Sequence, residues 1–527
     1  MTNRYLYITL LAILGFNTES VALDLTMQKN APRLVVSITI DQLRTDYLEA
    51  FAPLYSEGGF KRLLDKGVIF TNASYPFSPV DRASAIAAIS TGTTPYYNSI
   101  VGMQWLNRET LRPIGCVDDS RYTGMLTADN GSPAGMLSST LGDELKLATG
   151  GKALVYSIAP FRDAAILAAG HAADAALWID NVYGEWCSSI YYLQNVPSWL
   201  SVFNTTKAPC RFIHNVVWEP LNELTGSYNY YLQTKNDKPF KHKFSGDSRF
   251  AEYKESALVN ADVSELAMHC MGTVGMGSDK VTDLLCLTYY AGSFDSRIVT
   301  DCQMEMQDNY VRLDRELSRI MAYADYLVGS DNVLYVVTST GYSRVESTNY
   351  ATFRIPTGTF YMNRTAGLIN MYLGAIWGQG NYVETTFRNQ LFLNHKLLET
   401  KKISIGEASN RAQELVAMMA GVRNVYTSLQ LLTAQNPQSA KIRNAFNPQR
   451  CGDLIIEAAP GWKVLNEDTQ QSDVSVASFN PFPIIFCGQG LLPQRVFTPV
   501  TTDRIAPTIA RSIRIRAPNA CSSEPLF

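Results

Sequence analysis

Five short runs of consecutive apolar residues constrain the fold of this chain more than any other feature of its sequence. Each run is followed by a turn and then by a helical pattern, and the runs read RLVVSITIDQ, KALVYSIA, TDLLCLTYY, NVLYVVTST and FPIIFCGQG. Strands that are apolar throughout, rather than at alternate positions, are typical of a parallel sheet with both faces covered. The sequence therefore predicts an α/β fold with a doubly wound, mostly parallel sheet sandwiched by helices.

The clearest helix prediction covers residues 309–329, NYVRLDRELSRIMAYADYLVG, whose apolar residues recur every three or four positions up to a final glycine. Two long segments, at about 181–255 and 345–450, interrupt the alternation of strands and helices. Long segments of this kind in a compact domain are usually functional and have structure of their own, so we expect two cap insertions. Ligands of doubly wound sheets bind outside the carboxyl ends of the strands, which places the expected site there.

The composition excludes one class of partner. The chain has 527 residues, of which 46% are hydrophobic, and a formal net charge of −3. Binding to a phosphate backbone requires clustered Lys and Arg, so we expect no nucleic acid partner.

The N-terminal residues resemble an export signal. Arg4 precedes an apolar stretch from Tyr5 to Phe16, and the small-residue site Ser20-Val21-Ala22 follows. This order of charge, apolar core and cleavage site predicts a signal peptide at residues 1–22 and a periplasmic or secreted mature protein. No later segment has about 18 uninterrupted apolar residues, so we expect no transmembrane segment in the mature chain.

The nine cysteines include no C-x-x-C pair, which argues against a structural zinc site. In an oxidising compartment some cysteines can pair, and Cys187 with Cys210 is the predicted disulfide. Cys286 and Cys487 lie within apolar runs and are predicted to be small core residues.

Several stretches resemble the alkaline phosphatase superfamily, in particular its phosphate-irrepressible alkaline phosphatases and nucleotide pyrophosphatase/phosphodiesterases. They occur in family order from about residue 33 to the C-terminus: RLVVSITIDQLRTDYL, EGGFKRLLDKGVIFTNASYPFSP, AAGHAADAALWID, MQDNYVRLDRELSRIM, GLINMYLGAIWGQGNYV and TTDRIAPTIARSIRI. The resemblance implies one alkaline phosphatase-like domain at 23–527 that carries both cap insertions. It also implies two zinc ions at the strand ends and a metal-activated Thr or Ser that attacks phosphorus.

Most positions that carry this chemistry in the family hold other residues here. Asp41 matches the first metal carboxylate, but Arg82 stands where the resemblance places the nucleophile. The neighbouring Asp81 and Ser84 are interpreted as residues that cap a helix or lie at the surface. The phosphate-binding Asn falls on Met103.

The remaining family positions show the same loss. The Lys-x-Arg motif falls on Phe161 and Asp163, with Arg162 displaced by one residue toward the other face of a strand end. The zinc ligands of later strand ends fall on Asp295, which is retained, and on Val299, Ser339, Thr340 and Pro481, which replace them. Two retained carboxylates, Asp41 and Asp295, cannot complete a zinc site unaided.

From these residues we expect an alkaline phosphatase-fold pseudoenzyme of the cell envelope that has no cofactor and binds a protein partner. The residual pocket is predicted to contain Asp41, Arg82, Asp295, Ser339 and Thr340, with Arg82 close to one of the two carboxylates. None of the five histidines is spaced as a metal ligand with another. Two alternatives stay open: a divergent metal-dependent phosphodiesterase or phosphatase, and an anion-binding pocket in which Arg82 is the clamp.

Overall fold

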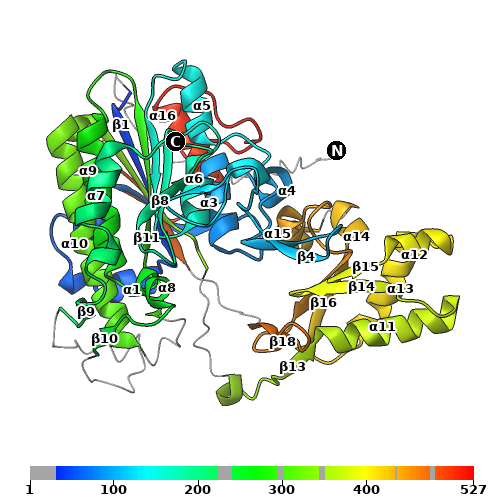
Figure 1. Ribbon diagram of the computed structural model, residues 1–527. Coiled ribbons are helices and arrows are strands. Elements are labelled where there is room, and N and C mark those ends of the chain that lie inside the picture. The colour runs from blue at the N-terminus through cyan, green and yellow to red at the C-terminus, as the bar shows by residue number, and fades with distance from the viewer. Residues whose placement is uncertain are drawn as a thin grey trace, which may run out of the picture.

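The computed structural model describes residues 31–221, 240–294, 302–342, 350–433, 436–474, 481–488 and 490–527. The predicted signal peptide lies outside these residues. Figure 1 shows a large body built on one sheet and, beside it, a smaller body formed by later residues. We call the smaller body, residues 359–474, the small lobe.

The main sheet is mixed and mostly parallel, which confirms the predicted fold class. Its strand order is β21-β2-β20-β12-β1-β11-β6-β7-β8-β5, with β22 beside β2. The strands are β1 (Leu34–Asp41), β2 (Val68–Ser74), β5 (Gly124–Met125), β6 (Val155–Ile158), β7 (Ala175–Ile179), β8 (Trp186–Ser189), β11 (Asp283–Tyr290), β12 (Val333–Ser339), β20 (Phe482–Gly488), β21 (Gln494–Val496) and β22 (Val500–Thr501).

All five apolar runs form strands of this sheet. Four of them, β1, β6, β11 and β12, are parallel, whereas β20 runs antiparallel to both of its neighbours, β12 and β2. A continuous apolar run indicates burial on both faces and carries no information on direction, so the orientation of β20 was not predictable from its composition.

Helices cover both faces of the main sheet. Along β1, Leu34, Val36, Ile38 and Ile40 pack toward α9 and α10, while Val35 packs toward α3, α5 and α16. Successive side chains of a strand point to opposite faces, which is why one apolar strand serves two cores. The helices of this body are α1 (Thr45–Ala50), α2 (Phe60–Lys66), α3 (Arg82–Thr91), α4 (Pro95–Asn98), α5 (Leu141–Ala148), α6 (Arg162–Ala169), α7 (Ser198–Thr206), α8 (Arg249–Lys254), α9 (Val259–Val274), α10 (Gln303–Val328) and α16 (Ile505–Ser512).

The predicted helix at 309–329 is confirmed as the larger part of α10. Its apolar stripe is buried, and the helix ends at Gly329, whose φ of 89° suits glycine. Two short hairpins complete the large body: β3 (Gln104–Asn107) with β4 (Arg112–Gly115), and β9 (Val217–Trp218) with β10 (His242–Lys243).

The small lobe has a hydrophobic core of its own. It contains β13 (Thr359–Tyr361), α11 (Met362–Trp377), β14 (Val383–Phe387), β15 (Gln390–Leu393), α12 (His395–Thr400), α13 (Ile405–Ala417), β16 (Val422–Thr427), α14 (Ser428–Thr433), α15 (Pro437–Ala445), β17 (Leu454–Ala458), β18 (Lys463–Asn466) and β19 (Gln471–Val474). Elements of this lobe continue past residue 450. The domain boundaries given above, 23–527 with insertions at 181–255 and 345–450, remain predictions.

A salt bridge and an aromatic contact join the small lobe to the large body. Arg108, in the turn between β3 and β4, lies 3.2 Å from Asp453 and packs over the ring of Phe392. Leu106 of the same hairpin lies in a small apolar cluster with Phe387 and Phe392. The hairpin therefore anchors the small lobe through both charge and apolar burial.

The predicted Cys187–Cys210 disulfide is wrong for this structure, in which neither Cys187 nor Cys210 forms a disulfide. Cys187 is buried within β8, and its thiol donates to the carbonyl oxygen of Trp178 at 3.3 Å. Because β8 pairs with β7 at this point, the thiol faces the sheet rather than the loop that holds Cys210. Cys286 and Cys487 are buried in strands, as predicted. None of the helices that the structure describes is long and apolar enough to cross a membrane.

His171 forms a charge-assisted contact that should make stability depend on pH. Its Nδ1 lies 2.9 Å from Asp143 and its Nε2 3.0 Å from the carbonyl oxygen of Met136, so both ring nitrogens face acceptors. Burial lowers the pKa of His171, but the hydrogen bond and charge of Asp143 outweigh burial and raise the pKa above its usual value.

We expect the stabilisation by His171 to be complete below about pH 6.5 and to be lost as pH rises through the raised pKa. Relative to His171→Gln, the wild-type chain should lose roughly 1 kcal/mol of unfolding free energy across that window, the size of one charge-assisted hydrogen bond. Urea unfolding at a series of pH values measures this difference. The exposed His214, changed to Gln, is the matched control, and a wild-type curve parallel to that of His171→Gln would contradict the prediction.

Candidate functional site

The carboxyl ends of two central strands and the first turns of two helices meet at one edge of the main sheet. β1 ends at Asp41 and β12 at Ser339, and the parallel register pairs Ile40 with Ser339. Arg82 is the first residue of α3, and Phe161 immediately precedes α6. We call the residues gathered here the strand-end cluster: Asp41, Arg82, Met103, Phe161, Asp163 and Thr340.

Ser339 and Thr340 tie the end of β12 to the end of β1. The Thr340 hydroxyl donates to Asp41 Oδ1 at 2.8 Å and accepts from the backbone N–H of Gln42 at 2.8 Å. The Ser339 hydroxyl donates to the carbonyl oxygen of Leu43 at 2.8 Å. Both side chains are fully buried, so these hydroxyls act as hydrogen-bonding groups of the backbone turn.

Arg82 occupies the centre of the cluster and is only 6% exposed. Its Nε and Nη2 donate to the two carboxylate oxygens of Asp163 at 2.9 and 3.0 Å, and its Nη1 lies 3.5 Å from Asp41 Oδ2. The guanidinium also lies over the ring of Phe161, 3.8 Å from the centroid, and contacts Met103 Sδ at 3.8 Å. A bidentate carboxylate and an aromatic face fix the position of the cation.

The mutual pKa shifts of Arg82 and Asp163 show that both stay charged. Burial lowers the pKa of Arg82, but the charges of Asp163 and then Asp41 outweigh it and raise the pKa well above its usual range. Burial raises the pKa of Asp163, but the charge and hydrogen bond of Arg82 outweigh it and hold the pKa below its usual value. The cluster is therefore a buried ion pair with a second carboxylate, Asp41, beside it.

A second cation lies behind Phe161. Lys254, the last residue of α8, is 4% exposed and places its Nζ 5.3 Å from the Phe161 ring centroid. Its Nζ donates to the carbonyl oxygen of Ile179 at 3.1 Å. Burial, followed by the repulsion of Arg82, lowers the pKa of Lys254 to about 8, although nearby Cys187 and Asp163 raise it. The sequence analysis did not identify this residue.

The structure brings together four residues of the predicted pocket: Asp41, Arg82, Ser339 and Thr340. The expected closeness of Arg82 to a retained carboxylate is confirmed for Asp41. Asp295 and Val299 lie outside the described residues. Pro481 precedes β20, and its carbonyl oxygen accepts from the backbone N–H of Thr45 at 3.0 Å.

Asp81 and Ser84 cap α3, as predicted. The Asp81 carboxylate accepts from the N–H of Ser84, the Ser84 hydroxyl accepts from the N–H of Asp81, and Ser84 is 1% exposed. Asp81 also accepts from the N–H of Met103 at 2.6 Å, which fixes the following loop against the helix start.

The expectation that Arg162 lies at the end of a strand was wrong. It is the first residue of α6 rather than the end of a strand, and it donates to the carbonyl oxygen of Asn130 and to Asp118. Asp163 was noted only as a replacement, and its pairing with Arg82 was missed. The sequence did contain a signal for this pairing. An arginine stands at the position that the resemblance assigns to the nucleophile, and an aspartate stands at a position that it assigns to a cation.

The histidines are distributed over the fold. His171 pairs with Asp143, His242 with Glu305 and His395 with Asp453. His269 packs between the rings of Trp199 and Phe203, and His214 is exposed. In the part of the chain that the structure describes, no three His, Cys, Asp or Glu side chains are grouped to hold a metal ion.

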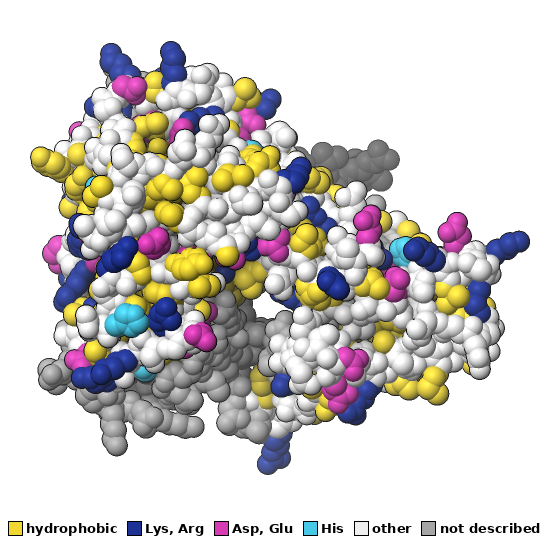
Figure 2. Space-filling model, in the orientation of Figure 1, with side chains coloured by type: hydrophobic (Ala, Val, Ile, Leu, Met, Phe, Trp, Pro, Cys, Tyr) yellow, Lys and Arg dark blue, Asp and Glu magenta, His cyan; other side chains and the backbone are white. Residues whose placement is uncertain are grey.

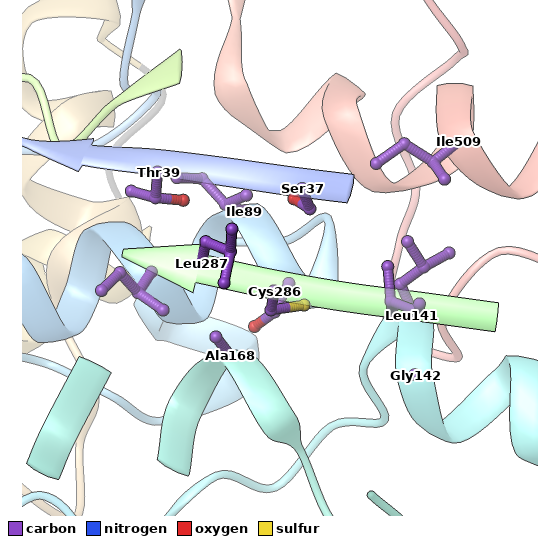
Figure 3. Close-up of a pocket in the computed structure, with 12 residues that line it drawn as sticks. Ser37, Thr39, Ile89, Leu141, Gly142, Ala168, Cys286, Leu287 and Ile509 are labelled. Atoms are coloured by element: carbon purple, nitrogen blue, oxygen red, sulfur yellow. The ribbon is translucent and has the colours of Figure 1, made fainter. Parts of the chain in front are cut away.

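A small cavity lies between the main sheet and the helices that cover one of its faces, rather than at the strand ends. It measures about 20 Å³ and is bounded by Ser37, Thr39 and Cys286 of the strands and by residues of α3, α5 and α16. Figure 3 shows these side chains facing one another between the sheet and the helices. Its volume is close to that needed for one water molecule, so it is not a substrate site.

Comparisons with known proteins agree with this architecture. The chain is 26% identical over 511 residues to alkaline phosphatase PhoV of Synechococcus elongatus, which covers 93% of this chain and 91% of the relative. It is 26% identical over 515 residues to alkaline phosphatase PafA of Elizabethkingia meningoseptica, with 94% of each chain covered. The crystal structure of wild-type PafA matches with a TM-score of 0.81 at 24% identity, covering 95% of this chain and 99% of that one.

The fold is thus that of the alkaline phosphatases. Residues 35–479 match the family of type I phosphodiesterases and nucleotide pyrophosphatases, and the chain belongs to this family.

These comparisons contradict the expectation that the chain has no cofactor. PhoV and PafA, which both align along nearly the whole chain, are named as alkaline phosphatases, and the resemblance described above implies zinc for that class. The described residues nevertheless do not fit the two-zinc site. Asp41 contacts Thr340 and Arg82, and Ser339 and Thr340 supply hydroxyls where the class has metal ligands.

The buried ion pair predicts a strong effect of removing one carboxylate. Asp163→Asn keeps the shape of the side chain but leaves the guanidinium of Arg82 with one carboxylate, so the free energy of unfolding should fall by roughly 3 kcal/mol. Asp118→Asn is the matched control, because its pair with Arg162 is partly exposed and should contribute less than about 1 kcal/mol. Denaturant unfolding measures the free energy of unfolding of both variants, and the m-value should be unchanged. Equal effects of the two variants would contradict the prediction.

Proposed function

We propose that this chain is a pseudoenzyme of its family, in which an internal ion pair replaces the phosphoryl-transfer site and the protein acts as a binding or scaffolding component of the cell envelope. The observation that carries the proposal is Arg82, buried and bound to Asp163, at the position where the resemblance places the nucleophile. A guanidinium with a raised pKa has no lone pair to attack phosphorus.

The charge of the cluster also opposes a phosphate ligand. Asp41 and Asp163 both lie at the strand ends and already engage the guanidinium of Arg82, so an entering phosphate ester would compete with two carboxylates for this cation. Taking Arg82 from Asp163 for use as an anion clamp would break a buried pair, at a cost of roughly 3–5 kcal/mol. This cost disfavours the alternative in which Arg82 binds an external anion.

The competing function is a divergent phosphodiesterase or phosphatase, which the family membership and the names of the relatives favour. It requires another nucleophile close to Asp41. The Ser84 hydroxyl is buried in the capping box of α3, and the Thr340 hydroxyl is buried against Asp41. Neither is accessible to a phosphorus atom in this conformation, so we propose the pseudoenzyme first.

We expect aryl phosphate monoesters and diesters, assayed with added zinc, to show no hydrolysis above that of Asp41→Ala. Alkaline phosphatase PafA serves as the positive control for the assay. The quadruple variant Arg82→Thr, Met103→Asn, Phe161→Lys and Asp163→Arg restores the residue types that the resemblance implies, and tests whether these four positions limit activity. Turnover by the wild-type chain that depends on Asp41 would restore the phosphodiesterase alternative.

We also propose that the mature chain is periplasmic or secreted and meets its protein partner there, on the basis of the charge and apolar pattern of residues 1–22. Cell fractionation with N-terminal sequencing should find a mature chain that begins at or near Leu23 in the soluble envelope fraction. Cross-linking of the wild-type and Asp163→Asn chains within that fraction tests whether binding of a partner depends on the strand-end cluster. Recovery of an intact Met1 from the cytosol would contradict this proposal.

A further inference from the structure

Beyond Arg364 in the first turn, the outward face of α11, in the small lobe, has none of the charged residues that a solvent-exposed helix normally carries. α11 buries Met362, Thr365, Ile369 and Leu373 against the core of the small lobe. From Thr365 to Trp377 its sequence, TAGLINMYLGAIW, contains no charged residue. A helix that is uncharged on all sides is usually buried on all sides.

The exposed side chains form one continuous stripe opposite the buried stripe. Met371 is 74% exposed and Leu368 is 49% exposed. Their neighbours on this face are small: Gly367, Gly374 and Ala375. A Cβ placed on Gly367 or Gly374 would have no neighbour within 4 Å, so the helix surface is open on both sides of Met371. We call these five residues the α11 face. Figure 2 shows hydrophobic side chains exposed along the lower edge of the small lobe, where Figure 1 places α11.

The two ends of α11 carry opposite charges. Glu467 and Asp468 lie beside the first turn, where they contact Asn363, and Glu467 also pairs with Arg364. At the other end the Lys401 Nζ donates to the carbonyl oxygens of Trp377 and Gly378, and the exposed Lys402 follows it. With Arg364 offsetting one carboxylate, the first turn keeps one net negative charge, and the Lys401 ammonium places a positive charge at the last turn.

We propose that the α11 face binds a second copy of this chain, with the two α11 helices antiparallel about a twofold axis at Met371. In this arrangement Leu368 of one copy lies opposite Gly374 of the other, so that a large side chain fills the space left by a glycine. The acidic end of each helix meets the basic end of its partner. Antiparallel helix dipoles add to this complementarity.

An anionic lipid surface is the other occupant that an uncharged helix face suggests. The carboxylates of Glu467 and Asp468 at one end of the helix would be repelled by anionic headgroups. A second copy instead brings Lys401, at the basic end of its helix, toward these acids. The charges at the helix ends therefore favour self-association.

Sedimentation velocity on the full-length chain tests the proposal. α11 has 16 residues and is about 24 Å long, so the contact is small and we expect a dissociation constant on the order of micromolar. Met371→Glu should shift the chain to monomer over the same concentration range. Met418→Glu is the matched control, since Met418 is 79% exposed and follows α13 in the same lobe. A wild-type chain that stays monomeric, or a dimer that survives Met371→Glu, would overturn the proposal.

Cysteine cross-linking tests the antiparallel geometry separately. Under mild oxidation Met371→Cys should form a disulfide-linked dimer, whereas Leu368→Cys should not, because it faces Gly374 of the other copy. Wild-type chain under the same conditions controls for the partly exposed Cys210 and Cys521. Cross-linking of both variants would indicate parallel helices. Binding of the wild-type chain to anionic vesicles, lost in Met371→Glu, would show a lipid occupant instead. Either result overturns the proposal.

Discussion

The buried contact of Arg82 with Asp163 and Asp41 connects the three elements that define the catalytic edge of this fold. Arg82 begins α3, Asp163 lies in the first turn of α6, and Asp41 ends β1. Asp41 and Arg82 are almost fully buried, so their charges are satisfied mainly by one another and by Asp163 rather than by bulk water. The positions of the two helix starts relative to the central strand therefore depend on one guanidinium.

Helix electrostatics explain why this arrangement tolerates a cation at a helix start. A helix N-terminus favours negative charge, so Arg82 at the first position of α3 is unfavourable by itself. Asp81 at the N-cap and Asp163 in the first turn of α6 supply the negative charge that both helix starts favour. In a phosphoryl-transfer enzyme, helix starts of this kind face the phosphate. Here the protein supplies the anion from its own chain, and this anion is held in place by Arg82.

The fold was predictable from the sequence because several separate segments each indicate the same architecture. The apolar runs that became β1, β6, β11 and β12 each indicate the same buried parallel sheet, and the loss of any one would leave the pattern readable. The direction of β20 was not predictable, since an apolar strand buried on both faces can run either way. The Cys187–Cys210 prediction failed for a local reason, because the sequence does not show which way a thiol within a strand points.

The candidate site was predictable only in part, because it depends on pairs of residues that are distant in the chain. The contact between Arg82 and Asp41 was predicted because a cation can replace the charge of a missing metal ion. The parts played by Asp163 and Lys254 were not predictable, because they depend on how α6 and α8 pack against the same aromatic ring. Phe161 illustrates the difficulty. From the sequence it is only a phenylalanine at a position where the resemblance places a lysine. In the structure two cations, Arg82 and Lys254, lie over its ring and restore positive charge at this position.

The strand-end cluster and the outward face of α11 rest on different hydrophobic cores, so a substitution in one need not disturb the other. The strand-end cluster rests on the main sheet, whose apolar contacts lie with α3, α6, α9 and α10, while α11 rests on the core of the small lobe. A substitution of Asp41, Arg82 or Asp163 alters a charged side chain without removing an apolar residue from either core. A substitution on the outward face of α11 removes none of the contacts that hold that helix, because its buried stripe lies on the opposite side. Changes at the strand ends and changes on the outward face of α11 therefore act on different cores of the fold.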